Sequence, residues 1–257
     1  MIEGAPLWLV IIGMFAVMAV AYEGGIRLHH AISPFADGKR NDSSDESHIM
    51  AAVFGLMALL LAFAFGLALN RYEERRNLDT SEASTISTFA SRIALLPQTE
   101  RDKVRPLLVE YARARLAASL EESGDLNAKS HNADLLHDRL EAQLYAVLAA
   151  LPADARTTLL VQAFDPLSDV ATDRQAAGAA RLPGPVVDLL ALYCVISSLM
   201  LGYAVAAANS RHRTTATIFF ALLAFAFAMI LDLDRPRGGL IVVPQDVLEQ
   251  AVGRLTG

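Results

Sequence analysis

The chain has 257 residues, of which 54% are apolar and 19% are charged, and its formal net charge is −6. This acidic balance, with no dense Lys/Arg face, argues against a nucleic-acid partner, and a single cysteine, Cys194, argues against a disulfide scaffold. Charge is also segregated, because residues 70–183 hold 14 of the 22 Lys/Arg and 17 of the 28 Asp/Glu. The sequence therefore predicts a polytopic membrane protein with one polar insert.

Four uncharged stretches are candidates for membrane spans, namely residues 7–22, 49–69, 189–208 and 214–231. A helix needs about 20 apolar residues, range ~17–25, to cross a bilayer. The first stretch is short, but Trp8 and Tyr22 at its ends favour the membrane interface and extend it. A signal peptide is the alternative for this stretch, yet the residues before it include Glu3 and no Lys or Arg. We therefore expect four transmembrane helices.

Four crossings place both termini and the polar insert on the same side of the membrane. That side carries the larger number of Lys and Arg close to the spans, so the positive-inside rule puts it in the cytoplasm. The predicted division is a first transmembrane pair in residues 1–69 with an extracytoplasmic loop at 23–48, a cytoplasmic helical domain at 70–183, a second transmembrane pair at 184–232 and a cytoplasmic tail at 233–257.

Helical periodicity dominates the insert, and no window of it alternates with the period of a strand. Apolar residues recur at helical spacing at Leu136, Leu140, Leu144, Val147 and Leu151. No Gly or Pro occurs between Leu67 and Leu96, so nothing ends the second helix at the membrane surface. A helix from residue 49 to about 96 would be roughly 70 Å long. The predicted class is all-α.

Motifs that would identify an enzyme or a cofactor site are missing from the sequence. It contains no Gly-rich phosphate loop, no GxSxG elbow, no HExxH pair and no two-cysteine metal spacing. His131, Asp134, His137 and Asp138 are spaced so that one helix could present them as metal ligands. A solvated helix face explains these residues equally well. Asp232 and Asp234 fall at the end of the fourth span, where water and headgroups can solvate them. We expect no enzymatic activity, metal or cofactor.

The second span carries a stripe of Gly55, Leu59 and Phe63 at four-residue steps. Two interpretations are open. The stripe can be a packing face, on which small residues such as Ala58, Ala62 and Gly66 permit close helix approach. Alternatively, equivalent stripes from several subunits surround an axis, and rings of Leu59 and Phe63 control ion flow by dewetting. Periodicity alone does not choose between them.

Residues 63–78 resemble the bestrophin stretch in which a pore-neck Phe precedes an Arg-aromatic-aromatic-Glu-x-Arg motif, matched here by Arg71, Tyr72, Glu74 and Arg76. After the last span, Asp234, Arg235, Pro236 and Gly238 resemble the acidic-x-Pro-x-Gly turn that follows the final bestrophin helix. Over nearly its whole length the chain is similar to the bacterial bestrophin-like family, long known as a domain of unknown function.

This resemblance implies a homo-oligomeric ion channel in the bacterial inner membrane, a homopentamer as in true bestrophins, with cytoplasmic termini. It makes Gly55, Leu59 and Phe63 the neck positions and implies three kinds of partner: the bilayer, further copies of the chain and small inorganic ions. We expect ion pairs of Arg71, Glu74 and Arg76 to hold the membrane–cytoplasm junction, and Asp232 to belong to the C-terminal turn.

Some positions depart from the bestrophin pattern. Glu73 replaces the second aromatic residue of the motif, and Gly55 leaves one neck ring open. The acidic cluster that binds calcium in animal channels is not evident beyond Asp232 and Asp234, which offer few of the 6 to 8 oxygen ligands that calcium takes. Calcium gating is therefore not expected. The alternative function is a non-conducting membrane scaffold or sensor that couples the bilayer to the helical insert.

Overall fold

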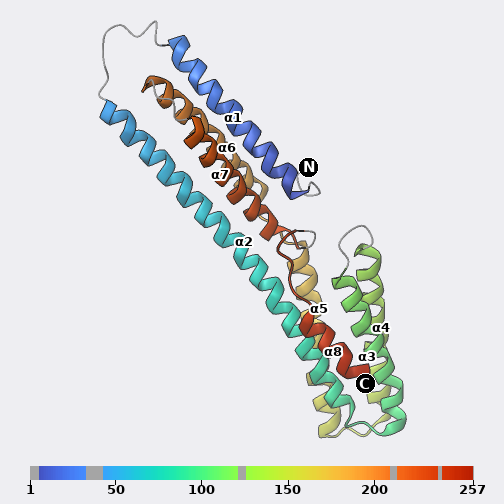
Figure 1. Cartoon of the computed structure of the whole chain (residues 1–257). Helices are drawn as coiled ribbons and strands as arrows, with labels where there is room; N and C mark the ends of the chain where they lie inside the picture. Colours follow the sequence, from blue (N-terminus) through green and yellow to red (C-terminus); the bar gives the residue numbers. More distant parts are fainter. Residues whose placement is uncertain (1–5, 33–42, 121–125, 209–212, 237–238, 257) are drawn as a thin grey trace. The chain divides into compact units, whose positions relative to one another are not determined.

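The computed structural model describes residues 6–32, 43–120, 126–208, 213–236 and 239–256. Every regular element in these ranges is an α-helix, which confirms the predicted class (Figure 1). In chain order they are α1 (Leu7–Ile32), α2 (Ser43–Ile93), α3 (Gln98–Ser119), α4 (Leu126–Ala150), α5 (Ala155–Ala179), α6 (Gly184–Ala207), α7 (Arg213–Asp234) and α8 (Asp246–Thr256).

The chain divides into two compact units. Unit 1 comprises Met1–Asn70 and Arg181–Arg235, and unit 2 comprises Arg71–Ala180 and Pro236–Gly257. α2 contributes to both units as one helix of 51 residues. Its continuity agrees with the lack of Gly and Pro after Gly66, since these are the residues that most often end a helix.

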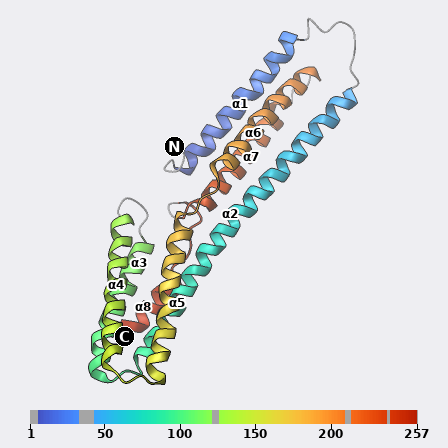
Figure 2. The same cartoon turned by 180° about the vertical axis from the view of Figure 1, so that it is seen from behind.

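Unit 1 contains the apolar helices. Four stretches of helix are long and apolar enough to cross a membrane, and they lie in α1, α2, α6 and α7. This confirms the four predicted spans. Seen from both sides, α1 lies next to α6 and α7 (Figure 2). Ring contacts join Tyr22 to Phe220 and Phe54 to Phe219, with centroids 5.5 and 5.6 Å apart.

Close approach of α1 and α6 depends on two glycines. A Cβ on Gly25 would lie 2.0 Å from the carbonyl oxygen of Leu199, and a Cβ on Gly202 would lie 2.0 Å from that of Tyr22. By contrast, a Cβ on Gly55 or Gly66 would meet no atom within 4 Å. Among the described glycines, those that permit close helix packing are therefore Gly25 of α1 and Gly202 of α6, and the predicted packing face at Gly55 and Gly66 of α2 is open.

Unit 2 has its own apolar core, formed by the C-terminal half of α2 together with α3, α4, α5 and α8. Its fully buried residues include Ile86 and Phe89 of α2, Leu108 of α3, Leu160 and Leu167 of α5 and Leu248 of α8. The repeat at Leu136, Leu140, Leu144 and Val147 forms the buried face of α4, as its spacing predicted. α8 also packs into this core, although no helix was predicted there from the sequence.

Candidate functional site

The Gly55, Leu59 and Phe63 stripe lies on the side of α2 opposite to its buried side. Met57, Ala64 and Ala68 are buried, whereas Leu59 is 51% exposed and Phe63 is 63% exposed. A helix turns by about 100° per residue, which places the two sets on opposite sides. Packing within the chain therefore leaves the whole stripe uncovered.

The residues that match the bestrophin motif begin unit 2. Arg71 and Tyr72 are half-buried, and Glu74 and Arg76 are exposed. Among the described residues, none of these four side chains forms an ion pair or a hydrogen bond with another part of the chain. Their expected pairing with neighbouring helices thus stays a prediction, and it would require partners beyond a single subunit.

The C-terminal turn contains buried rather than solvated acids. Asp232 is fully buried, and Asp234 is 8% exposed. The backbone N–H of Leu182 donates to Asp234 Oδ1 at 2.8 Å, which joins the segment just before α6 to the end of α7. The expectation that water and headgroups solvate these acids is therefore wrong for the folded chain. Gly238, the last residue of the predicted turn, lies outside the described residues.

A buried ionic network in unit 2 was not predicted. Its centre is Glu82 of α2, whose side chain has no exposed surface. Glu82 Oε1 accepts a hydrogen bond from Arg115 Nε at 2.5 Å and one from the Tyr111 hydroxyl at 3.4 Å. Its second oxygen pairs with Arg174 of α5. One carboxylate therefore joins α2, α3 and α5.

Arg174 extends this network toward the C-terminal segment. It also pairs with Asp79 and donates to Ser119 Oγ at 2.6 Å. Gln245, which immediately precedes α8, donates from Nε2 to Asp79 Oδ2 at 2.5 Å. Burial lowers the pKa of Arg174, and the nearby Asp79 carboxylate opposes that change. The guanidinium stays charged, because the ordinary pKa of arginine lies far above neutral pH.

Comparison with known proteins assigns the family. A family model for the bestrophin-like domain matches residues 8–248, which is most of the chain. The chain belongs to the bestrophin-like family.

Solved structures have the same fold as this bestrophin-like protein. A variant of a bacterial bestrophin homolog from Klebsiella pneumoniae superposes with a TM-score of 0.69 at 14% identity, covering 96% of this chain and 99% of that one. Another crystal structure of a bacterial bestrophin homolog from Klebsiella pneumoniae gives 0.69 at 16% identity, covering 95% and 97%. A third, described as a membrane protein, gives 0.68 at 15% identity, covering 96% and 98%. No curated protein matches the sequence.

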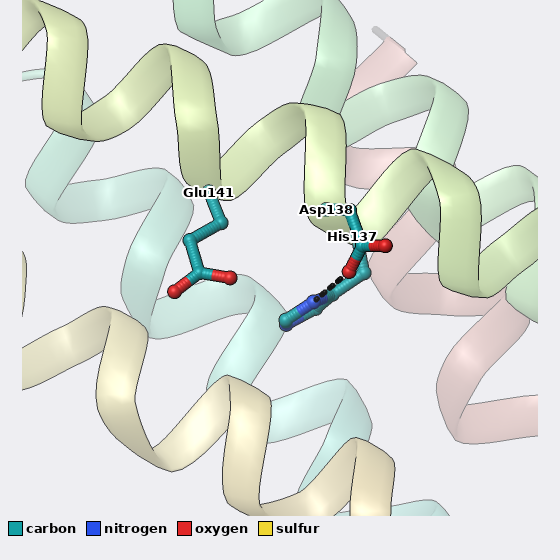
Figure 3. A group of neighbouring side chains, drawn as sticks. All are labelled: His137, Asp138 and Glu141. Carbon is teal, nitrogen blue, oxygen red and sulfur yellow. Dashed lines mark ion pairs between the residues drawn. The ribbon is translucent and has the colours of Figure 1, made fainter.

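A group of possible metal ligands occurs on α4 of this bestrophin-like chain. Ligand atoms of His137, Asp138 and Glu141 lie within 4.8 Å of one another (Figure 3). The His137 ring stacks on Phe164 with centroids 5.4 Å apart, and its Nε2 lies 3.0 Å from Ser168 Oγ. Core packing and this hydrogen bond account for the position of His137.

The other candidate metal ligands on α4 do not gather around His137 as a set. Asp138 is 76% exposed on its side chain, so water solvates it. Asp134 accepts a hydrogen bond from Gln175 Nε2 at 2.8 Å, and His131 is exposed. The structure therefore brings together only His137 and Asp138 of the four candidate ligands. One exposed and one partly buried carboxylate beside one histidine on a single helix do not establish a metal site.

One sequence feature could have revealed the ionic network of unit 2. Asp79 and Glu82 are one helical turn apart and share a face of α2 with Ile86 and Phe89, both of which are buried. Acids on the apolar face of a helix require buried cations, because an unpaired charge is costly to bury. The partners themselves could not be identified, since Arg115 and Arg174 lie 33 and 92 residues from Glu82.

Proposed function

We propose that this bestrophin-like protein is a homo-oligomeric ion channel in which α2 lines an apolar neck at Gly55, Leu59 and Phe63. The observation that carries this proposal is the uncovered stripe opposite the buried side of α2. An apolar stripe along a membrane helix needs either lipid or another protein surface to cover it. Around an oligomer axis the same stripe would instead surround a narrow path.

The chemistry of the stripe supports passage of ions rather than catalysis. Leu59 and Phe63 carry no group that can donate or accept a proton, so they offer nothing for acid–base or nucleophilic chemistry. Rings of such side chains form a hydrophobic constriction that gates by dewetting. The substrates would be small inorganic ions. Because these rings carry no charge, they would not by themselves select cations or anions.

Stoichiometry is the first test, because a neck requires a ring of subunits. Light scattering of the protein in nanodiscs, corrected for lipid, should give five times the 27.7 kDa of one chain. A monomer or dimer in every membrane mimetic would leave no ring for Phe63 to complete. That result would favour the non-conducting scaffold or sensor.

Ion flux is the second test. Phe63→Ala and Leu59→Ala should widen the neck and raise the flux of potassium or chloride from liposomes. Matched controls are Phe225→Ala and Leu222→Ala on α7, which remove side chains of the same type that are 52% and 65% exposed. Equal flux in neck and control variants, with assembly intact, would contradict the neck assignment.

We further propose that the membrane is the bacterial inner membrane, with both termini and the helical insert in the cytoplasm. Cys194 is the only cysteine, so Cys194→Ser gives a background without thiols. On this background, Lys39→Cys should react with an impermeant maleimide in intact cells. Lys103→Cys on α3 should react only after the cells are opened. The reverse pattern would invert the orientation.

A further inference from the structure

A cavity of about 350 Å³ lies within unit 2, beside the ionic network. Its wall is contributed by α2, α3, α4, α5 and the segment that precedes α8. Small-molecule sites typically have volumes of about 300–1,000 Å³ and few, well-placed polar groups. The cavity is therefore large enough for a small organic ligand and larger than a single inorganic ion requires.

Three arginines lie on the described part of the cavity wall. Among the described residues that line it, Arg75, Arg115 and Arg174 stand beside one acid, Asp79. Glu82 binds Arg115 and Arg174 but is not itself among the described lining residues. Arg75 and Arg115 are 7% and 6% exposed, so their charges are held in a medium that screens them weakly.

Neutral groups complete the wall. Ser119, Ser130 and Gln245 supply hydroxyl and amide groups. Val243 and Pro236 provide an apolar section that can contact the organic part of a ligand. Guanidinium groups match the oxygens of phosphate in a bidentate geometry, and a phosphate monoester carries about −1.5 to −2 charges at neutral pH. A phosphate group is therefore chemically suited to the three arginines of the described wall.

We propose that this cavity binds a small phosphate ester, either a free metabolite or the headgroup of an anionic phospholipid. Its phosphate would face Arg75, Arg115 and Arg174, and its organic part would lie against Val243 and Pro236. Bound ligand would join α2 and α5 to the segment before α8. This binding does not depend on ion conduction, so it can be tested separately from the channel.

Gly178 offers a way to block the cavity without removing a charge. It lines the cavity on α5, and a Cβ at this position would meet nothing within 4 Å. Gly178→Leu should therefore fill part of the cavity and leave the arginines in place. Gly253→Leu on α8 is the matched control, because Gly253 is also helical, has open space at its Cβ and does not line the cavity.

The experiment measures the melting temperature of the full chain in phosphatidylcholine nanodiscs at constant ionic strength. Glycerol 3-phosphate is the probe, inorganic phosphate tests the phosphate group alone, and glycerol is the uncharged control. We expect glycerol 3-phosphate to raise the melting temperature and glycerol to leave it unchanged. The apparent Kd should increase roughly tenfold or more in Gly178→Leu and in Arg75→Gln, and stay unchanged in Gly253→Leu.

Two results would overturn the proposal: no rise for the wild type in phosphatidylcholine discs, or equal affinities of Gly178→Leu and Gly253→Leu. Repeating the titration in discs that contain phosphatidylglycerol shows whether the ligand is a lipid headgroup or a free metabolite. A lipid headgroup would occupy the cavity and abolish the response to glycerol 3-phosphate. A free metabolite site would respond equally in both kinds of disc.

Discussion

Gly25 of α1 lies directly against Leu199 of α6, where a Cβ on the glycine would be 2.0 Å from the leucine carbonyl oxygen. The neighbouring Gly24 has no atom within 4 Å of the same position. Two adjacent glycines on one helix thus have different roles. Only Gly25 permits the two backbones to approach, as small residues do between membrane helices.

Replacing Gly25 by Ala should therefore push α1 away from α6. The new Cβ would meet backbone atoms, which cannot rotate aside as a side chain can. The free energy of unfolding should therefore fall by an amount at the upper end of the ~1–3 kcal/mol typical of overpacking. Gly24→Ala is the control and should leave stability unchanged. Thermal unfolding of both variants in the same detergent tests this difference. Equal melting temperatures would mean that α1 and α6 do not pack through Gly25.

Removal of the charge at Glu82 should destabilise unit 2 strongly. Glu82→Gln leaves the buried Arg115 and the partly buried Arg174 without their shared carboxylate. Breaking a buried pair in this way costs about 3–5 kcal/mol. Circular dichroism during thermal or chemical unfolding measures this decrease in the free energy of unfolding.

A surface pair provides the comparison for Glu82. Glu100 and Lys103 form a 2.9 Å pair on α3, in which the lysine side chain is 50% exposed. Exposed pairs contribute only ~0–1 kcal/mol, so Glu100→Gln should change stability little. If Glu82→Gln were as mild as Glu100→Gln, the network would not hold α2, α3 and α5 together.

Glu74 should act through assembly rather than through folding of one chain. Its side chain is exposed in the single subunit, as is that of the adjacent Glu73. If Glu74 pairs with a neighbouring subunit, Glu74→Gln should lower the fraction of oligomer, with about 0.2–1 kcal/mol lost per pair. Glu73→Gln should not. Mass photometry across a dilution series compares the two variants, and identical oligomer fractions would remove Glu74 from the junction.

Much of the helical architecture was predictable, because long uncharged stretches leave few alternatives. A stretch such as residues 49–69 must form a helix in a membrane to satisfy its backbone. The Leu140 and Leu144 repeat likewise identified the buried face of α4, since only one side of a helix can bury those residues together. Such local patterns fix the type of element and the face that packs.

Contacts between distant elements were not predictable in the same way. Small residues occur in α1, α2 and α6, and only the packed structure shows that Gly25 and Gly202 permit close contact while Gly55 does not. Asp232 stands at the end of an apolar stretch, where solvation and burial fit the sequence equally well. Glu82 was overlooked because charge in a polar insert is usually solvated, and its cations come from other helices.

Asp154 should make a small, pH-dependent contribution to the stability of α5. Its side chain caps the helix by accepting hydrogen bonds from the N–H groups of Arg156 and Thr157. The Arg156 side chain, followed by the Thr157 backbone N–H, lowers the pKa of this carboxyl below its usual value of 3.8. The stabilisation is therefore fully present above that value and is lost as the pH falls through the lowered pKa of the folded state.

Asp154→Asn keeps a capping oxygen but removes the titration. The melting temperature of the wild type should exceed that of Asp154→Asn at about pH 6, and the gap should narrow toward about pH 3 as the carboxyl protonates. Asp138→Asn, which changes an exposed acid on α4, serves as the control for general effects of charge. A gap for Asp154→Asn that is constant across this range would show that the ionised carboxylate contributes nothing beyond the cap itself.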